Sequence, residues 1–258
     1  MTAMDGDIRL EIGEGVAELV IDRPAKHNAM TPDMARKLAT MVRELDDNDD
    51  VRAVLLRGAG ERAFCSGSDL NALAAYPSAW HFRNRVEYAN AVRTMRKPVV
   101  AALQGWTLGG GAEMALAADL RIAAETTRYG FPEVQRGWVG GGGASHVLPR
   151  LIGQGQAMRL LMLGQQIDAA EALRLGLCEE VVTVSELLGR AREVALRLAS
   201  FSPVAVQSVK AAVRMSMETP LSAGLVYENE MNVLCFSAGD HLEGIKAFNE
   251  KRAAQFTR

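Results

Sequence analysis

Two glycine-bearing turns contain the residues of this sequence that could most directly form a reactive site together. Residues 66–69 (Ser-Gly-Ser-Asp) and the glycine run 109–111 each follow a short apolar run and precede a helical segment. Glycine lets the backbone approach a ligand closely, and a helix start offers free N–H groups with partial positive charge. Two such turns side by side would direct two amides at one anionic oxygen, which is an oxyanion hole. Taken singly, each is more simply explained as a tight turn.

Two glutamates accompany these turns. Glu113 lies in the first helical turn after the second glycine run, and Glu133 follows the next expected strand. A helix out and a strand back return the chain to its starting point, so the two carboxylates could face each other. Paired acids near an apolar pocket can divide acid and base roles, because burial and mutual repulsion separate their pKa values. The alternatives are a helix-dipole partner for Glu113 and a solvated turn residue for Glu133.

Other reactive residue types give no comparable pattern. The four histidines and three cysteines lack the spacing of metal ligands or of a disulfide framework, so we expect neither. Neither glycine turn has the GxxxxGK[ST] or GxGxxG pattern of a phosphate-binding loop. A nucleophile at Cys65 is a weaker interpretation, because no GxSxG elbow or Ser–His–Asp set accompanies it. The glycine run 140–143 indicates a flexible or closely packed loop at the mouth of a site.

Composition excludes several classes of partner. The chain has 258 residues with 29 basic and 31 acidic side chains, and 48% of its residues are hydrophobic. This is ordinary globular composition without the concentrated basic charge of nucleic-acid binders. The first residues lack the basic and apolar regions of a signal peptide, and no apolar run approaches the ~18 residues of a membrane span. We therefore expect a cytoplasmic protein that binds neither nucleic acid nor membrane.

The elements that must position these residues change in character along the chain. Before residue 125, short β-like runs alternate with helices, one of which begins at Thr31-Pro32 as N-cap and first helical residue. From residue 153 onward every segment has helical spacing, which predicts an all-helical last part. No flexible linker divides the two parts, so the helical part is expected to dock on the first. Residues 203–217 place Val206, Val209, Val213 and Met217 on one stripe.

With turns and glutamates placed, the sequence resembles the enoyl-CoA hydratase/isomerase (crotonase) superfamily over nearly its whole length. Five family motifs occur in order: RPxxxNAx at 23–30, AFxxGxDL at 63–70, GxxxGGGxE at 105–113, FPE at 131–133 and an AFxEKR-like tail at 247–252. One segment departs from the family pattern. Where many hydratases read GxxPGxGGTQRL, residues 137–148 read GWVGGGGASHVL, with Gly140 in place of proline.

The resemblance implies an α/β fold. The family forms a spiral of ββα units followed by an all-helical C-terminal trimerisation region. We accordingly divide the chain into a spiral core with the CoA site, residues 1–195, and a helical C-terminal region, residues 196–258. A homotrimer or a dimer of trimers is expected.

The resemblance also implies roles for particular residues. The backbone N–H groups of Ser68 and Gly110 would form the oxyanion hole. Glu133 would donate a proton to C2, and Glu113 would orient and deprotonate the water. Further expected contacts with the acyl-CoA thioester are Lys26, Ala29, Ser66, Gly67, Asp69, Leu70, Gly109, Pro132, Trp138, Phe248 and Lys251. No metal or bound cofactor is expected, because coenzyme A is part of the substrate.

Both glutamates are present, as in hydratases of the family, so the expected activity is reversible addition of water across the 2,3 double bond of an enoyl-CoA. One alternative is isomerisation of a 3-enoyl-CoA to the 2-ene, or another acyl-CoA reaction of the superfamily, for which one glutamate suffices. A second is a non-catalytic homologue that binds acyl-CoA. The intact acid pair speaks against this binder, because binding gains nothing from two acids held together.

Overall fold

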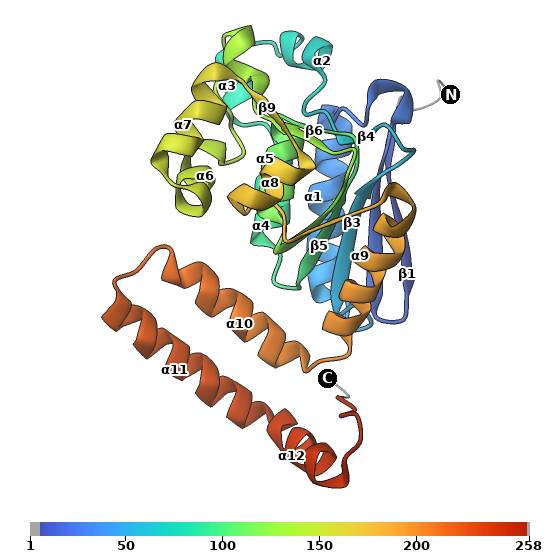
Figure 1. The fold of residues 1–258 in the computed structure, drawn as a ribbon, viewed down its shortest axis with the longest axis vertical. Helices are drawn as coiled ribbons and strands as arrows, with labels where there is room; N and C mark the ends of the chain where they lie inside the picture. Colours follow the sequence, from blue (N-terminus) through green and yellow to red (C-terminus); the bar gives the residue numbers. More distant parts are fainter. Residues whose placement is uncertain (1–5, 257–258) are drawn as a thin grey trace.

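The computed structural model describes residues 6–256, which fold around two sheets (Figure 1). The larger sheet is parallel apart from its first two strands, which form an antiparallel hairpin. Its strands, in spatial order, are β1 (Asp7–Gly13), β2 (Val16–Asp22), β3 (Ala53–Gly58), β5 (Val99–Leu103), β7 (Leu120–Ala124) and β10 (Glu180–Val182). The smaller sheet contains β4 (Ala63–Cys65), β6 (Trp106–Leu108), β8 (Arg128–Gly130) and β9 (Gln166–Asp168).

The chain alternates between the two sheets. The strand pairs β3–β4, β5–β6 and β7–β8 each place their first strand in the larger sheet and their second in the smaller one. Helices follow each pair: α2 (Leu70–Ala74), α3 (Ala79–Arg83) and α4 (Tyr88–Thr94) after the first, α5 (Gly110–Ala117) after the second, and η2 (Pro132–Arg136), α6 (Ala144–Ile152) and α7 (Gln154–Leu163) after the third. This repetition confirms the expected spiral of ββα units.

The larger sheet is buried on both faces. Adjacent residues of β3 illustrate this: Leu56 packs in a cluster with Leu38 of α1 (Pro32–Asp47), whereas Leu55 packs with Ala191 of α9 (Val184–Ala199). Such two-sided burial is typical of parallel sheets covered by helices. The Thr31 hydroxyl accepts the Met34 N–H in the first turn of α1, so Thr31 is the N-cap that the sequence predicts.

Two expectations about the elements were wrong. The region beyond residue 153 is not all helical, because β9 and β10 extend the two sheets on either side of α8 (Ala169–Leu175). Each strand has three residues, too few to display an alternating pattern, and is defined by its pairing, β9 with β8 and β10 with β7. The sequence also predicts a helical region from about residue 69 to residue 96 with one interruption near Pro77. The structure has that interruption but also a second break before α4, so the region forms three short helices, α2–α4.

The last three helices leave the body of the molecule. We call α10 (Pro203–Ser216), α11 (Leu221–Ala238) and α12 (Asp240–Glu250) the C-terminal arm. Figure 1 shows α10 nearest the body, α11 running alongside it, and α12 at the far end. The predicted apolar stripe of α10 stays uncovered in this chain: Val209 and Val213 are 63% and 62% exposed. The boundary expected after residue 195 falls inside α9, before the arm begins. No helix within residues 6–256 is long and apolar enough to cross a membrane.

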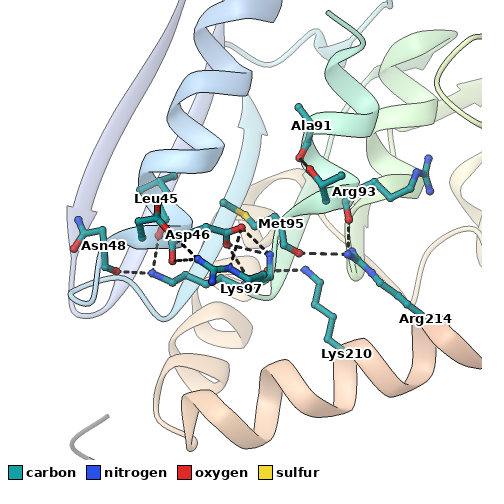
Figure 2. Close-up of polar contacts among 12 residues, drawn as sticks. Leu45, Asp46, Asn48, Ala91, Arg93, Met95, Lys97, Lys210 and Arg214 are labelled. Carbon is teal, nitrogen blue, oxygen red and sulfur yellow. Dashed lines mark hydrogen bonds and ion pairs between the residues drawn. The ribbon is translucent and has the colours of Figure 1, made fainter. Parts of the chain in front are cut away.

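Polar contacts hold the arm to the body (Figure 2). Lys210 of α10 donates to the Lys97 carbonyl and pairs with Asp119, each at 2.6 Å. Arg214, one turn further along α10, pairs with the same Asp119 at 2.9 Å and donates to the Arg93 carbonyl. The end of α4 and the start of β5 are thereby fixed to the arm.

Candidate active site

Three neighbouring strands of the smaller sheet deliver the two glycine turns and Glu133. β4 pairs in parallel with β6, and β6 in parallel with β8, so the carboxyl ends of all three lie at one edge of the sheet. The turn at 66–69 follows β4, the glycine run 109–111 follows β6, and Glu133 follows β8. The Gly109 N–H donates to the Gly130 carbonyl at 2.9 Å, which ties the second turn to the third strand. Topology therefore assembles these segments.

The two turns bring the proposed amide pair together. A Cβ atom on Gly67 would lie 3.3 Å from the Gly110 nitrogen, so the first turn passes directly beside the start of α5. Within residues 6–256, neither the Ser68 nor the Gly110 N–H donates a hydrogen bond, although the neighbouring Gly109 and Asp69 amides both do. Two adjacent free amides could stabilise a carbonyl oxygen as it gains charge.

Buried hydrogen bonds and an ion pair fix the turn at 66–69. Asn28 is fully buried; its side-chain amide donates to the Ala63 carbonyl at 2.8 Å and accepts the Arg23 N–H at 3.0 Å. Arg23 in turn pairs with Asp69 at 2.7 Å, and this hydrogen bond lowers the pKa of the aspartate. The Asp69 carboxylate also accepts two N–H groups in the first turn of α2, those of its second and third residues. Asp69 lines the cavity, but its carboxylate is already engaged by Arg23 and α2.

Glu113 points inward from α5. Only 3% of the residue is exposed, and its carboxylate accepts the Ala144 N–H at 3.0 Å, at the start of α6. Burial raises the pKa of Glu113 to about 7, against the opposing effect of the Ala144 and Gly142 amides. This carboxyl group can therefore exchange a proton near neutral pH.

Glu133 lies over the second glycine turn. Its Oε1 atom is 3.0 Å from the position that a Cβ on Gly109 would occupy, and Gly109 has the left-handed φ of 55° that favours glycine. Glu133 is half-buried, and burial raises its pKa above the ordinary value. The charge of Glu133 also raises the pKa of Glu113, so the two carboxyl groups share one site electrostatically.

The glycine run 140–143 is closely packed on Glu113. A Cβ on Gly140 would lie 2.5 Å from Oε1 of Glu113, and one on Gly142 would lie 2.8 Å from Oε2. Of the two interpretations left open by the sequence, the structure thus supports close packing. The glycines allow the loop to approach the carboxylate from one side while α5 supports it from the other.

A cavity of about 470 Å³ joins these features. Thirteen expected site residues line it: Lys26, Ala29, Ser66, Gly67, Ser68, Asp69, Leu70, Gly109, Gly110, Glu113, Pro132, Glu133 and Trp138. Phe248 and Lys251 do not line it, because they lie at the end of the arm, where Phe248 is 83% exposed. Figure 1 shows α12 at the end of the molecule opposite α2. The structure therefore does not place these two residues where they could contact a CoA thioester bound in the cavity of their own chain.

Among the cavity-wall residues that the sequence analysis missed are four that interact with one another or with the first turn. The Tyr88 hydroxyl lies 3.1 Å from the Ser68 hydroxyl, beside the first turn. Arg85 stacks over Phe82 with 4.1 Å between guanidinium carbon and ring centre, and pairs with Glu87 at 3.2 Å. No motif marks these residues, and a charged pair among aromatic residues is the only signal that could have found them.

The alternative of a cysteine nucleophile is not supported. Cys65 is fully buried, and burial raises the pKa of its thiol to about 12. The reactive thiolate is therefore almost absent near neutral pH. The carboxyl groups and the free amides remain the candidates for chemistry at this site.

Comparison with known proteins agrees with this geometry. Residues 11–258 match the model of the enoyl-CoA hydratase/isomerase family. The chain belongs to this family. It is 36% identical to a short-chain-enoyl-CoA hydratase of Clostridium acetobutylicum, with 95% of each chain aligned, and 37% identical to a crotonyl-CoA hydratase of Syntrophomonas wolfei, with 97% of each aligned. A crystal structure of enoyl-CoA hydratase from Bacillus anthracis superposes with a TM-score of 0.92 at 34% identity, covering 97% of this chain and 98% of that one.

Proposed function

We propose that this protein is an enoyl-CoA hydratase, which adds water reversibly across the 2,3 double bond of an enoyl-CoA thioester. The observation that carries the proposal is one cavity in which two free amides lie beside two carboxyl groups with raised pKa values. The relatives named as hydratases of short-chain enoyl-CoA and crotonyl-CoA support water addition as the reaction.

In this proposal the amides of Ser68 and Gly110 bind the thioester oxygen. That oxygen becomes enolate-like as water adds at C3, and the two N–H groups stabilise the charge at the moment it develops. Loss of one such donor typically costs about 3–4 kcal/mol of barrier. The Ser68 amide lies in the turn after β4 and the Gly110 amide at the start of α5, and these positions keep both N–H groups oriented before substrate binds.

The two glutamates move the protons. Glu113 orients the water and takes one proton as the oxygen bonds to C3, and Glu133 delivers a proton to C2. The proton that Glu113 took from the water then passes to Glu133, so the pair holds one proton before and after each turnover. The backbone amides of Ala144 and Gly142 suit Glu113 to the role of base, because they hold its carboxylate in place and favour its charged form. The proposal includes no metal ion and no cofactor besides the coenzyme A of the substrate.

The cavity also indicates how the thioester lies. Exposed Lys26 on the rim offers a positive charge to the phosphates of coenzyme A. The Arg85–Glu87 pair, Phe82 and Trp138 form the wall on the side of Gly141, near the loop that packs on Glu113. A long alkyl chain would have to desolvate this ion pair, so we propose a preference for short acyl groups.

We further propose that chains assemble as trimers or dimers of trimers through the uncovered apolar faces of the arm. Val209, Val213, Leu225 and Val226 are each more than half exposed in the single chain. Assembly would bury them, and it would allow Phe248 and Lys251 to reach the coenzyme A bound by a neighbouring chain.

A panel of CoA thioesters tests the proposed activity. We expect crotonyl-CoA to lose its absorbance at catalytic protein concentrations, with kcat/KM falling as the acyl chain lengthens. Turnover of a 3-enoyl-CoA without hydration of any 2-enoyl-CoA would assign an isomerase instead. Tight acyl-CoA binding without turnover of either class would assign a non-catalytic binder.

Substitution of Gly110 by alanine tests the amide pair. A Cβ on Gly110 would lie 2.0 Å from the Tyr88 hydroxyl oxygen, so the turn must shift and move its N–H. We expect kcat for crotonyl-CoA hydration to fall about 10²-fold or more, the usual cost of a lost oxyanion donor. Gly155 of α7 provides the matched control, because a Cβ there meets nothing within 4 Å and alanine should leave the rate unchanged. Equal rates for the Gly110→Ala and Gly155→Ala proteins would exclude this oxyanion hole.

A further inference from the structure

Arg93 lies outside the cavity wall but contacts the loop that packs on Glu113. It belongs to the last turn of α4, and its guanidinium donates to the Gly142 carbonyl at 2.7 Å. A Cβ on Gly143 would lie 2.8 Å from the same nitrogen, so the guanidinium lies directly against the 140–143 loop. None of the family motifs in the sequence includes Arg93.

The residue that Arg93 holds is also one that stabilises the charge of Glu113. The Gly142 amide acts on the Glu113 carboxylate together with the Ala144 amide, which donates at 3.0 Å. Gly142 thus has its carbonyl bonded to Arg93 and its N–H directed to Glu113. A change at the carbonyl would move the peptide segment that carries these two amides.

The backbone of Arg93 is itself fixed from the opposite side. Figure 2 shows Arg214 reaching from α10 to the carbonyls of Arg93 and Met95, while the guanidinium of Arg93 points away from α10. Asp119 pairs with Arg214 at 2.9 Å and so holds Arg214 in place. Hydrogen bonds therefore connect the C-terminal arm, the end of α4 and the loop beside Glu113.

We propose that Arg93 is a positioning residue: it holds the Gly142 peptide against Glu113 and places a positive charge behind that carboxylate. The effect on Glu113 requires only the observed contacts, whereas the effect on turnover rests on the proposed hydratase function. Arg93 touches no substrate in this scheme and acts through the loop.

Arg93 acts on Glu113 in two ways, by holding the Gly142 peptide and by its positive charge. Both favour the charged form of Glu113. The guanidinium and the carboxylate also interact directly, because the charge of Glu113 raises the pKa of Arg93 against the effects of burial and of Arg214. Loss of Arg93 should therefore raise the pKa of Glu113 above its value of about 7. The other titratable groups that act electrostatically with Glu113 are Glu87 at the N-cap of α4, Tyr88 of α4, Tyr129 of β8 and Glu133 of η2.

Carbon-13 NMR of protein labelled at the glutamate carboxyl carbons tests this directly, with Glu113→Gln to assign the signal. In the Arg93→Met protein we expect the Glu113 midpoint to rise by about half a pH unit or more, the scale of a lost neighbouring charge. Arg93→Lys keeps the charge and should recover at least half of that shift. A midpoint unchanged in Arg93→Met would overturn the proposal.

Arg150→Met is the matched control. Arg150 lines the same surface cavity as Arg93 and is exposed. Among the residues that the structure describes, its side chain donates only to the His146 carbonyl of its own helix. Its removal should leave the Glu113 midpoint unchanged, and an equal shift in both variants would show a nonspecific effect and overturn the proposal. If Arg93→Met does not fold, the comparison is made with Arg93→Gln and Arg93→Lys, where a higher midpoint in the glutamine variant is the supporting result.

Kinetics separate this inference from the proposed function. In the Arg93→Met protein the acid limb of the pH profile of kcat for crotonyl-CoA should move upward by the shift measured by NMR, with KM changed less than about threefold, because the binding surface is intact. A purely structural role would lower activity equally at all pH values and would contradict the proposal. Absence of turnover in the unmodified protein would overturn the hydratase function, whereas the NMR midpoint would still decide whether Arg93 controls Glu113.

Discussion

Replacing Glu133 with glutamine is expected to lower kcat for crotonyl-CoA hydration by about a thousandfold or more, on the scale of lost general acid–base catalysis combined with disturbance of the paired carboxyl group. Glutamine keeps the size of the side chain over Gly109 but cannot deliver a proton to C2. KM should change little, because the cavity wall is preserved. Initial rates across a range of crotonyl-CoA concentrations measure both parameters.

Isotope exchange identifies the step that Glu133 serves. The saturated thioester butanoyl-CoA has no double bond to hydrate, but its C2 hydrogen can exchange with deuterium oxide if a base lies beside C2 and the amides stabilise the enolate. We expect Glu133→Gln to abolish this exchange. Glu125→Gln, an exposed residue after β7, serves as the control and should behave as the unmodified protein does. Wild-type hydration by the Glu133→Gln protein would refute the assignment of Glu133.

The site illustrates what the sequence could predict. The turn at 66–69, the glycine run 109–111 and the two glutamates were found because each has a local signal, such as glycine after an apolar run or an acid in a first helical turn. Their assembly needed more than this signal. Parallel pairing of β4, β6 and β8 places the three segments at one edge, and each of these strands has only three residues. Pattern alone could not predict that pairing, and the family resemblance supplied it.

Residues whose roles depend on tertiary contacts had no local signal in the sequence. Tyr88 explains why residue 110 must be glycine, and Arg85 and Glu87 form a charged pair in the cavity wall, yet all three lie in a stretch without a motif. Their roles depend on how three short helices fold over the smaller sheet, which follows from long-range packing. The same holds for Arg93, whose partner Gly142 is far along the chain.

The C-terminal arm shows the opposite case, a local signal that was correct but has no use within one chain. The apolar stripe of α10 has helical spacing as predicted, but Val209 and Val213 remain exposed. No described element of the same chain covers this face, so the pattern predicts a helix without revealing what would cover it. For the same reason the tail motif at 247–252 identifies the family but does not reach the cavity of its own chain.

Substitution of Glu113 by glutamine separates the two halves of the proposed reaction. We expect hydration of crotonyl-CoA to fall about a thousandfold, because no base remains to take the proton of the water. Exchange of the C2 hydrogen of butanoyl-CoA should persist within about tenfold of the unmodified rate, since Glu133 and the amides suffice for it. Loss of exchange together with hydration would assign the C2 proton to Glu113, and full activity on a 3-enoyl-CoA with weak hydration by the unmodified protein would favour an isomerase.

The same variant should be more stable than the unmodified protein at high pH. Burial raises the pKa of Glu113 from 4.5 to about 7, so the folded state binds a proton more tightly than the unfolded state does. The unmodified protein therefore loses stability as pH rises from 4.5 through 7, by about 3 kcal/mol in total, and glutamine removes this loss. Urea unfolding at pH 5 and pH 8 measures the difference. The gain in unfolding free energy of the Glu113→Gln protein should be larger at pH 8. Holding a charged carboxylate in this cavity costs stability, and the same cost makes that group an effective base. A stability difference that does not change with pH would mean that Glu113 is not held in the buried state that its proposed role requires.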